Sequence, residues 1–268
     1  MRYQHLTKFL SEEELSTLHE KTVSVVGLGG IGSCVAELLV RSGISLRIVE
    51  KDRVLEEDMD RLSMFSNKHV SKFKATEAKK LLNKINPEVI VKSFNEEVTV
   101  QSLFLMDADL VLDCSGNNDL TPLISSYCAK NGIACIAGGI RGTQGIVIRS
   151  TKEKTVQDHL DDLPFERTEG LIPSASRIVA GMMYVKALKA LLAKDDDKPV
   201  VVYDIWNQES VSASQKPKKS AKKKGSEKKP VKKKASSKKS AKKISTKKKS
   251  AKKKTSSKTS TKKKSSKK

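Results

Sequence analysis

The sequence predicts an α/β protein built on a doubly wound, mostly parallel sheet of the Rossmann-like kind. Three apolar runs support this prediction, at residues 23–26, 46–49 and 109–113. Continuous apolar runs of this length are typical of parallel strands, because such strands are buried on both faces. Segments with helical spacing of apolar residues separate the runs, so strands and helices alternate along the chain.

Each further element follows from a local signal. Ser11 to Glu14 has the Ser-x-x-Glu form of a capping box, which predicts a short first helix, and Gly43 is placed to end the second helix. We expect helices at 31–42, 74–84, 100–106, 120–131 and 174–193. We expect strands at 89–91, 133–137, 146–149 and 200–203, the last followed by Ile205-Trp206. Residues 138–145 are expected to form a turn, and residues 151–172 a polar, irregular segment.

A glycine-rich turn follows the first apolar run. It reads Gly27-Leu-Gly29-Gly30-Ile-Gly32 and contains the pattern G-x-G-x-x-G. Between a strand and a helix, the first glycine of this pattern allows a tight turn, the second lets backbone N–H groups approach a phosphate, and the third lets helix and strand pack closely. Glu50 ends the second apolar run, where a carboxylate can accept ribose hydroxyls. These features predict a nucleotide site without specifying the nucleotide.

Two basic residues downstream of the turn indicate which nucleotide is bound. Arg61 ends an acidic segment, and Lys74 opens an amphipathic helix thirteen residues later. Two cations can neutralise a triphosphate, and its leaving pyrophosphate, in an adenylyl transfer. Hydride transfer needs neither cation. An NAD dehydrogenase, the class of protein in which such a turn is most common, is therefore the least favoured functional hypothesis. The alternative for Lys74 is a solvated charge on a helix.

The sequence resembles the adenylating enzymes of the ThiF/MoeB/HesA and ubiquitin-activating E1 type over roughly residues 1–206. The resemblance is carried by the glycine turn, Glu50, Asp52, Arg61, Lys74, Asn86-Pro87, Leu112-Asp113-Cys114-Ser115 and the segment 138–145. It implies a ThiF-type fold that binds ATP and Mg²⁺. It also implies adenylation of the C-terminal Gly-Gly carboxylate of a ubiquitin-like or sulfur-carrier protein of the β-grasp type, by a homodimer.

The same resemblance implies the site residues. Those expected to bind the nucleotide are Gly27, Gly29, Gly30, Gly32, Glu50, Asp52, Arg61, Lys74 and Asp113. Arg61 and Lys74, on the β and γ phosphates, are the expected catalytic residues. Glu50 is expected on the ribose, and Asp113 is the expected Mg²⁺ ligand.

Several positions depart from the family pattern. His5 stands where relatives carry an arginine that enters the partner subunit's ATP site, and Leu62 replaces a glutamine. Glu57-Asp58 replaces a Ser-Asn pair within the acidic segment 56–60, whose carboxylates we expect to face water. Gly116 occupies the position of the Mg²⁺-binding aspartate, so Asp113 or Asp119 would have to hold the ion.

Cysteine usage limits the chemistry further. Many relatives carry a zinc site made of two C-x-x-C pairs, but the four cysteines of this chain form no such pair, and no zinc is predicted. E1-type relatives place a nucleophilic cysteine in the crossover loop, which corresponds here to residues 151–172 and contains no cysteine. Thioester formation needs a thiolate, so we expect no nucleophilic cysteine and an acyl-adenylate as the product.

Charge divides the chain into two parts. The chain has 53 Lys and Arg against 31 Asp and Glu; 27 lysines and one acid lie in residues 216–268, which leaves 26 basic and 30 acidic residues before them. We expect an adenylation domain at 1–212 and a disordered tail at 213–268, because the tail has too few apolar residues to fold. Such a tail suits non-specific binding to nucleic acid or another polyanion. A solubilising extension, or lysines that accept the activated modifier, are the alternatives.

We therefore expect an ATP-dependent adenylyltransferase. We expect it to be cytoplasmic, since the sequence has no apolar run of about 18 residues and its N-terminus lacks the apolar core of a signal peptide. Its tail would associate it with nucleic acid. Two alternatives stay open. A tRNA-modifying E1-like ATPase is favoured by the polylysine tail, and a non-catalytic ATP-binding module tethered to nucleic acid is favoured by Gly116 and His5.

Overall fold

The computed structural model of the chain describes residues 2–163, 172–194 and 198–211. The strands are β1 (Thr22–Val26), β2 (Ser45–Val49), β3 (Val91–Phe94), β4 (Leu110–Asp113), β5 (Ala134–Arg141), β6 (Gln144–Arg149), β7 (Val200–Asp204) and β8 (Glu209–Val211). The α-helices are α1 (Glu12–His19), α2 (Gly30–Arg41), α3 (Lys74–Ile85), α4 (Leu120–Lys130), α5 (Val156–Asp161) and α6 (Pro173–Leu191). Short 3₁₀ helices are η1 (Leu6–Lys8), η2 (Glu56–Asp60), η3 (Asn67–His69) and η4 (Leu103–Met106).

The described strands form one sheet in the order β3-β2-β1-β4-β5-β6-β7-β8. Neighbouring strands from β3 to β5 are parallel, and β6, β7 and β8 are added antiparallel. The strand order reverses direction between β1 and β4, which defines a topological switch point. In sheets of this kind, ligands bind beyond the carboxyl ends of the strands at such a point. The predicted Rossmann-like fold is confirmed.

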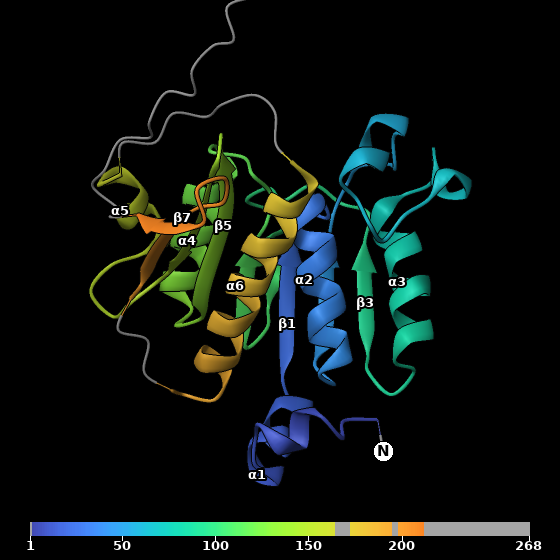
Figure 1. Cartoon of the computed structure of the whole chain (residues 1–268), viewed down its shortest axis with the longest axis horizontal. Coiled ribbons are helices and arrows are strands. Elements are labelled where there is room, and N and C mark those ends of the chain that lie inside the picture. The colour runs from blue at the N-terminus through green and yellow to red at the C-terminus, as the bar shows by residue number, and fades with distance from the viewer. Residues whose placement is uncertain (1, 164–171, 195–197, 212–268) are drawn as a thin grey trace, which may run out of the picture. The chain divides into compact units, whose positions relative to one another are not determined.

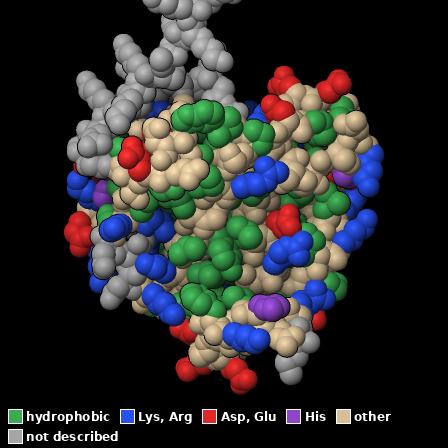
Figure 2. Space-filling view, viewed as in Figure 1, with side chains coloured by type: hydrophobic (Ala, Val, Ile, Leu, Met, Phe, Trp, Pro, Cys, Tyr) green, Lys and Arg blue, Asp and Glu red, His purple; other side chains and the backbone are tan. Residues whose placement is uncertain are grey.

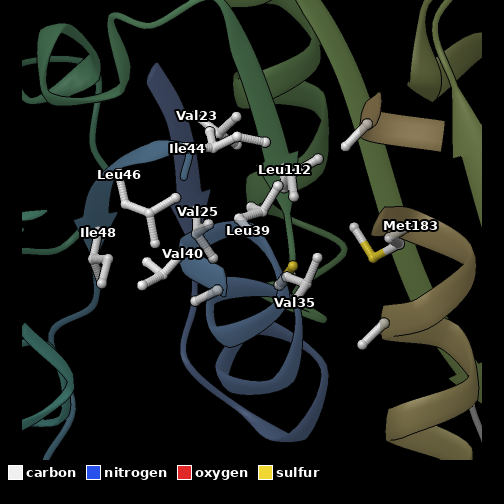
Figure 3. Packing of buried hydrophobic residues seen from close by; sticks show 14 of the residues in the cluster. Val23, Val25, Val35, Leu39, Val40, Ile44, Leu46, Ile48, Leu112 and Met183 are labelled. Atoms are coloured by element: carbon white, nitrogen blue, oxygen red, sulfur yellow. The ribbon is translucent and has the colours of Figure 1, made fainter. Parts of the chain in front are cut away.

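Helices cover both faces of the sheet (Figure 1). On one face, α2, α3 and α6 pack on alternate strand residues; Figure 3 shows Val25 and Leu112 of the strands facing Leu39 of α2, with Met183 of α6 beside them. On the other face, α4, α5 and η4 pack on the intervening strand residues. Alternation along each strand therefore gives the sheet two apolar faces, as the continuous apolar runs predict. Among the described residues, no helix is long and apolar enough to cross a bilayer.

Local signals predicted most element boundaries. Ser11 and Glu14 form the reciprocal capping box of α1, with bonds of 3.1 Å and 2.9 Å. Gly43 follows α2 with a φ of +81°, a conformation that favours glycine.

Four expectations for the elements were wrong. The expected turn at 138–145 is instead a hairpin, in which β5 continues to Arg141 and pairs antiparallel with β6. Gly138 and Gly145 lie in its strands because α6 packs so closely that a Cβ would collide with Met183 and Val179. The expected helix at 100–106 is only the short η4. The expected irregular segment contains α5, whose N-cap is Thr155. The strand expected at 89–91 lies instead at Val91–Phe94, as β3. The strand expected at 200–203 is β7, after which the chain returns as β8.

Candidate functional site

The glycine turn lies at the switch point, between the end of β1 and the start of α2. Gly27 has a φ of +87°, and a Cβ there would lie 2.8 Å from the Ser115 Cα. A Cβ on Gly32 would overlap the carbonyl oxygen of Gly27. Both residues must therefore be glycine for β1, α2 and the loop after β4 to approach one another.

Gly29 has a different environment. A Cβ built there meets no atom within 4 Å, so the missing side chain leaves open space over the turn. Gly29 is also the N-cap of α2 and offers no side-chain cap to the first-turn N–H groups. These N–H groups and the positive end of the helix dipole can accept an anion. The turn therefore fits a phosphate group.

Glu50 is joined to this turn by hydrogen bonds. It directly follows β2, is 9% exposed, and its Oε2 accepts a bond of 2.7 Å from the Leu28 backbone N–H. Its Oε1 accepts a bond of 2.8 Å from the Asp52 backbone N–H. The carboxylate thus fixes the glycine turn against β2, and its remaining lone pairs are what a ribose hydroxyl could use.

Arg61 and Lys74 converge on one side chain, the carboxylate of Asp58. Arg61 Nη2 lies 2.7 Å from Asp58 Oδ1, and Lys74 Nζ lies 3.0 Å from Asp58 Oδ2. Their backbones border the site, since a Cβ on Gly30 would lie 3.7 Å from the Arg61 carbonyl oxygen and the Lys74 N–H donates to the Asp52 carbonyl oxygen at 3.0 Å. Asp58 therefore holds the two cations together, and the backbone of Arg61 lies next to Gly30 of the glycine turn.

The expectation that the acidic segment faces water is right for Glu56, Glu57 and Asp60 but wrong for Asp58. The side chain of Asp58 is only 2% exposed. It also accepts a hydrogen bond of 3.0 Å from the Leu55 backbone N–H, which caps η2. The neighbouring cations and this cap replace the water that an exposed carboxylate would bind.

Asp113 ends β4 on the far side of the switch point. Its Oδ1 accepts bonds from the Ser115 N–H at 3.0 Å and the Ser115 hydroxyl at 2.6 Å, and its Oδ2 accepts one from the Thr121 hydroxyl at 2.7 Å. The side chain is buried, whereas Asp119 is exposed at the start of α4. Asp113 thus organises the loop that contains Gly116.

A metal site is not preformed in the part of the chain that the structure describes, where no three His, Cys, Asp or Glu side chains cluster. Mg²⁺ in nucleotide sites usually takes one or two carboxylates together with phosphates and water, so a protein cluster is not required. A Mg²⁺ ion could use the one lone pair that Asp113 has left, or the carboxylate of Asp119. The assignment of Mg²⁺ to Asp113 stays a prediction.

The four cysteines differ in burial. Cys114, Cys128 and Cys135 are buried. Burial, with a smaller contribution from Asp113, raises the pKa of Cys114 well above its usual value. A hydrogen bond from the Cys135 thiol to Cys128, together with burial, does the same for the pKa of Cys135. Cys34 of α2 is half-buried, with its Sγ 3.6 Å from the Ser63 hydroxyl. The thiols of Cys114 and Cys135 are therefore kept protonated and are poor nucleophiles.

The N-terminal residues lie at the other end of α3. Arg2 Nη1 donates a hydrogen bond of 2.8 Å to the Ile85 carbonyl oxygen, while Lys74 opens the same helix. Twelve residues separate the two ends of this helix, which is about 18 Å at 1.5 Å per residue. Arg2 is thus remote from this chain's own glycine turn, and His5 is exposed.

Sequence reasoning missed the role of Asp58. One signal was available, because Asp58 precedes Arg61 by three residues and follows Leu55 by three, the spacing at which a side chain reaches the neighbouring turn. The partners of Asp113 and Glu50 had no comparable signal, since loop conformation and strand pairing determine which backbone N–H groups they meet.

The mostly parallel sheet, its switch point and the glycine turn after β1 define a domain of the Rossmann-like class. Within this class, the chain belongs to the ThiF family, whose sequence profile matches residues 2–227.

Curated relatives name the activities found in this family. The chain is 29% identical over 203 residues to the sulfur carrier protein ThiS adenylyltransferase of Bacillus subtilis, covering 72% of this chain and 60% of that protein. It is 25% identical over 236 residues to the ubiquitin-like modifier-activating enzyme 5 of Drosophila mojavensis, covering 76% and 59%. The chain thus spans about 60% of the length of these relatives.

Solved structures share the fold. E. coli MccB in complex with MccA-N7isoASN superimposes with a TM-score of 0.68 at 18% identity, covering 81% of this chain and 73% of that chain. PaaA superimposes with a TM-score of 0.67 at 17% identity, covering 78% and 80%. MccB has also been solved with ATP. At these identities the likeness is one of fold.

Proposed function

We propose that the chain is an ATP-dependent adenylyltransferase that activates the C-terminal carboxylate of a ubiquitin-like or sulfur-carrier protein. The observation that carries this proposal is the convergence of Arg61 and Lys74 beside the glycine turn at the switch point. Two cations at one point would offset part of the negative charge of a triphosphate and of the pyrophosphate that leaves it. A dinucleotide dehydrogenase has no use for such a pair. The activities named for the curated relatives support the same reading.

The chain's own groups would position the reactants. The first-turn N–H groups of α2 would donate to the phosphates over Gly29, and Glu50 would accept from the ribose hydroxyls with Asp52 beside it. ATP supplies the adenylyl group: the carrier's carboxylate oxygen bonds to the α-phosphorus as the bond to the pyrophosphate oxygen breaks. Arg61 and Lys74 would stabilise the charge that develops on the leaving pyrophosphate. Asp113 or Asp119 would hold Mg²⁺, which adds positive charge at the phosphates.

The product of this proposal is an acyl-adenylate. Residues 151–172 contain no cysteine, and the pKa values of Cys114 and Cys135 are raised. Neither feature favours a thioester on this chain. A separate nucleophile or sulfur donor would take the activated carrier. Residues 164–171 of this loop lie outside the described residues.

Carrier-dependent exchange of labelled pyrophosphate into ATP tests the proposal. Exchange should appear when a small β-grasp protein ending in Gly-Gly is added, and K74M should abolish it. The matched control is K80M, which removes an exposed lysine six residues further along α3 and should leave exchange intact. Exchange that tRNA stimulates but no carrier does would instead select the tRNA-modifying alternative. ATP binding without exchange under any partner would select a non-catalytic module.

The lysine-rich tail supports a second, independent proposal. Residues 212–268 lie outside the described residues, so their disorder stays a prediction. With 27 lysines and one acid in residues 216–268, the tail should bind nucleic acid or another polyanion non-specifically. RNA binding should weaken steeply with salt and vanish in a chain that ends at Gln215. A shallow salt dependence would contradict the proposal.

An apolar groove supports pairing of two copies, the homodimer that the resemblance implies. It is about 640 Å³; apolar residues of α6 and β7 line it, namely Ile178, Met182, Val185 and Val201, together with Gly181 and the three lysines Lys186, Lys189 and Lys198. Figure 2 shows apolar side chains gathered over α6 on this face, and Val185 is 52% exposed. Burying such a surface against its copy would stabilise a dimer. Light scattering should give a dimer for the chain and a monomer for V185E; a monomeric parent would contradict the proposal.

A further inference from the structure

The buried carboxylate of Asp58 is the one feature of this site that adenylyl transfer does not require. It contacts Arg61 Nη2 at 2.7 Å and Lys74 Nζ at 3.0 Å, and it is 2% exposed. These are the same two cations that would receive the phosphates. A carboxylate and a phosphate beside the same cations repel each other, because like charges in a poorly solvated site disfavour one another.

We propose that Asp58 is an internal counter-ion that takes the place of a phosphate between Arg61 and Lys74, so that a nucleotide must displace it from these cations. The inference rests on the proposed function for the identity of the nucleotide. The competition between anions does not depend on adenylyl transfer itself.

The need for a counter-ion follows from burial. The Lys74 side chain is 9% exposed, and the Arg61 side chain is 30% exposed. A buried ammonium without a partner is strongly destabilising, whereas a paired one is tolerated. In the absence of nucleotide, Asp58 supplies that pairing and keeps both cations at the site. Its presence lowers the charge of the cluster from +2 to +1.

This competition would make Asp58 a specificity-determining residue. The carboxylate contacts the cations through two separate oxygens, so a ligand must offer at least two charged oxygens at different points to replace both contacts. A monophosphate also has such oxygens, but a triphosphate carries about twice its negative charge and competes better with the Asp58 carboxylate. When pyrophosphate leaves, the carboxylate returns to the cations and opposes rebinding.

The neighbouring Asp60 provides an internal comparison. It lies 3.1 Å from Arg61 Nη1 but is 73% exposed. Water and salt screen a pair of this kind, which therefore contributes little. Both aspartates contact the same guanidinium, so burial rather than acidity distinguishes them. Asp60 is thus the matched control for Asp58.

The test compares D58N with D60N in the full chain. Asparagine keeps the size of aspartate and an oxygen that can accept from the Leu55 N–H, but it carries no charge. The readout is the rise of the melting temperature with inorganic tripolyphosphate, ATP or AMP at fixed ionic strength. The melting temperature reports ligand binding to the folded domain. The variant R61Q/K74M measures the rise in melting temperature that comes from phosphate binding to the tail lysines.

D58N should reach the same rise in melting temperature at a tripolyphosphate or ATP concentration about tenfold lower than the parent chain needs, and its preference for ATP over AMP should fall. D60N should differ from the parent by less than about twofold. If D58N needs an equal or higher concentration than the parent for the same rise, the inference is overturned. So would a D60N effect as large as that of D58N.

A second pair of variants covers the case in which D58N does not fold. R61Q leaves a neutral Asp58–Lys74 pair, and D58N/R61Q leaves Lys74 with a neutral neighbour. The double variant should respond to tripolyphosphate at about tenfold lower concentration than R61Q; an equal response would overturn the inference. Tighter binding without pyrophosphate exchange would leave the inference standing and remove the proposed function. If no variant shows a rise in melting temperature with tripolyphosphate or ATP, both the inference and the proposed function are overturned.

Discussion

The two sides of the candidate nucleotide site are built differently. On one side, backbone geometry fixes the glycine turn: Gly27 and Gly32 leave no room for a Cβ, and Glu50 bonds to two backbone N–H groups. On the other side, side-chain charge fixes the cation cluster, in which Asp58 holds Arg61 and Lys74. Steric changes should therefore damage the first side, and charge changes the second.

The largest effect is expected from G32A. A methyl group there overlaps the Gly27 carbonyl oxygen, and because that atom is backbone, either the turn or α2 must move. Overpacking with backbone displacement costs about 3 kcal/mol of unfolding free energy. Urea unfolding of the full chain measures it.

G29A is the steric control for this prediction. Its Cβ meets no atom within 4 Å, so stability should change by less than about 1 kcal/mol. The methyl group would nevertheless fill the open space over the turn and weaken ATP binding. Equal destabilisation by G29A and G32A would contradict the steric account of this side.

A smaller loss is expected from K74M. It leaves the buried Asp58 carboxylate with Arg61 alone, and loss of one partner of a buried pair costs about 2 kcal/mol or more. K80M, in an exposed pair with Glu77 on the same helix, should change stability by less than about 1 kcal/mol. Both values come from urea unfolding. Similar losses in the two variants would show that burial does not set the strength of the cluster.

Next in size is E50Q. The Leu28 and Asp52 amides would then donate to a neutral acceptor instead of a carboxylate, and the NH₂ group of glutamine cannot accept the second bond. The expected loss is about 1 to 2 kcal/mol of unfolding free energy. Since the turn itself depends on these bonds, amide exchange at Leu28 should also accelerate. Unchanged exchange would argue against this role of Glu50.

The smallest effect is a pH dependence from His69, which lies in η3 between the two cations in sequence. Burial, with a smaller contribution from Lys68, lowers its pKa below the ordinary value of 6.5. The folded state then binds fewer protons than the unfolded state, so stability is present above about pH 6.5 and decreases as pH falls through the lower folded pKa. The Nδ1 atom accepts from the Ser66 N–H at 3.0 Å, which only neutral imidazole can do.

Urea unfolding at pH 7.5 and pH 5.5 checks this prediction, with H69N as the comparison because its amide oxygen can accept from the same N–H. The parent should lose more unfolding free energy than H69N between these pH values. The same decrease in both would assign the pH dependence to other groups.

The sequence predicted the steric side of the site better than the charged side. A glycine pattern between a strand and a helix has one geometric solution, so Gly27, Gly32 and the switch point could be located from residue order alone. The fate of Asp58 depends on burial, which follows from how η2 packs beside α3. Sequence neighbours could not reveal that packing, and three of the four acids in η2 indeed face water.

The fold shows the same division. The apolar runs predict the buried parallel strands. The glycines at 138–145 instead indicate a turn, although these residues form the β5–β6 hairpin. Those glycines are needed because α6, a helix about 40 residues later in the chain, packs directly against them. Contacts between distant segments are what local patterns cannot supply.

The central claim, that Arg61 and Lys74 receive the phosphates of ATP, is tested most directly by comparing ATP with NAD⁺ in thermal unfolding of the full chain and of R61Q/K74M. ATP should raise the melting temperature of the parent more than NAD⁺ does, and the double variant should lose the ATP response. A larger response to NAD⁺, or an ATP response that survives in the double variant, would contradict the claim.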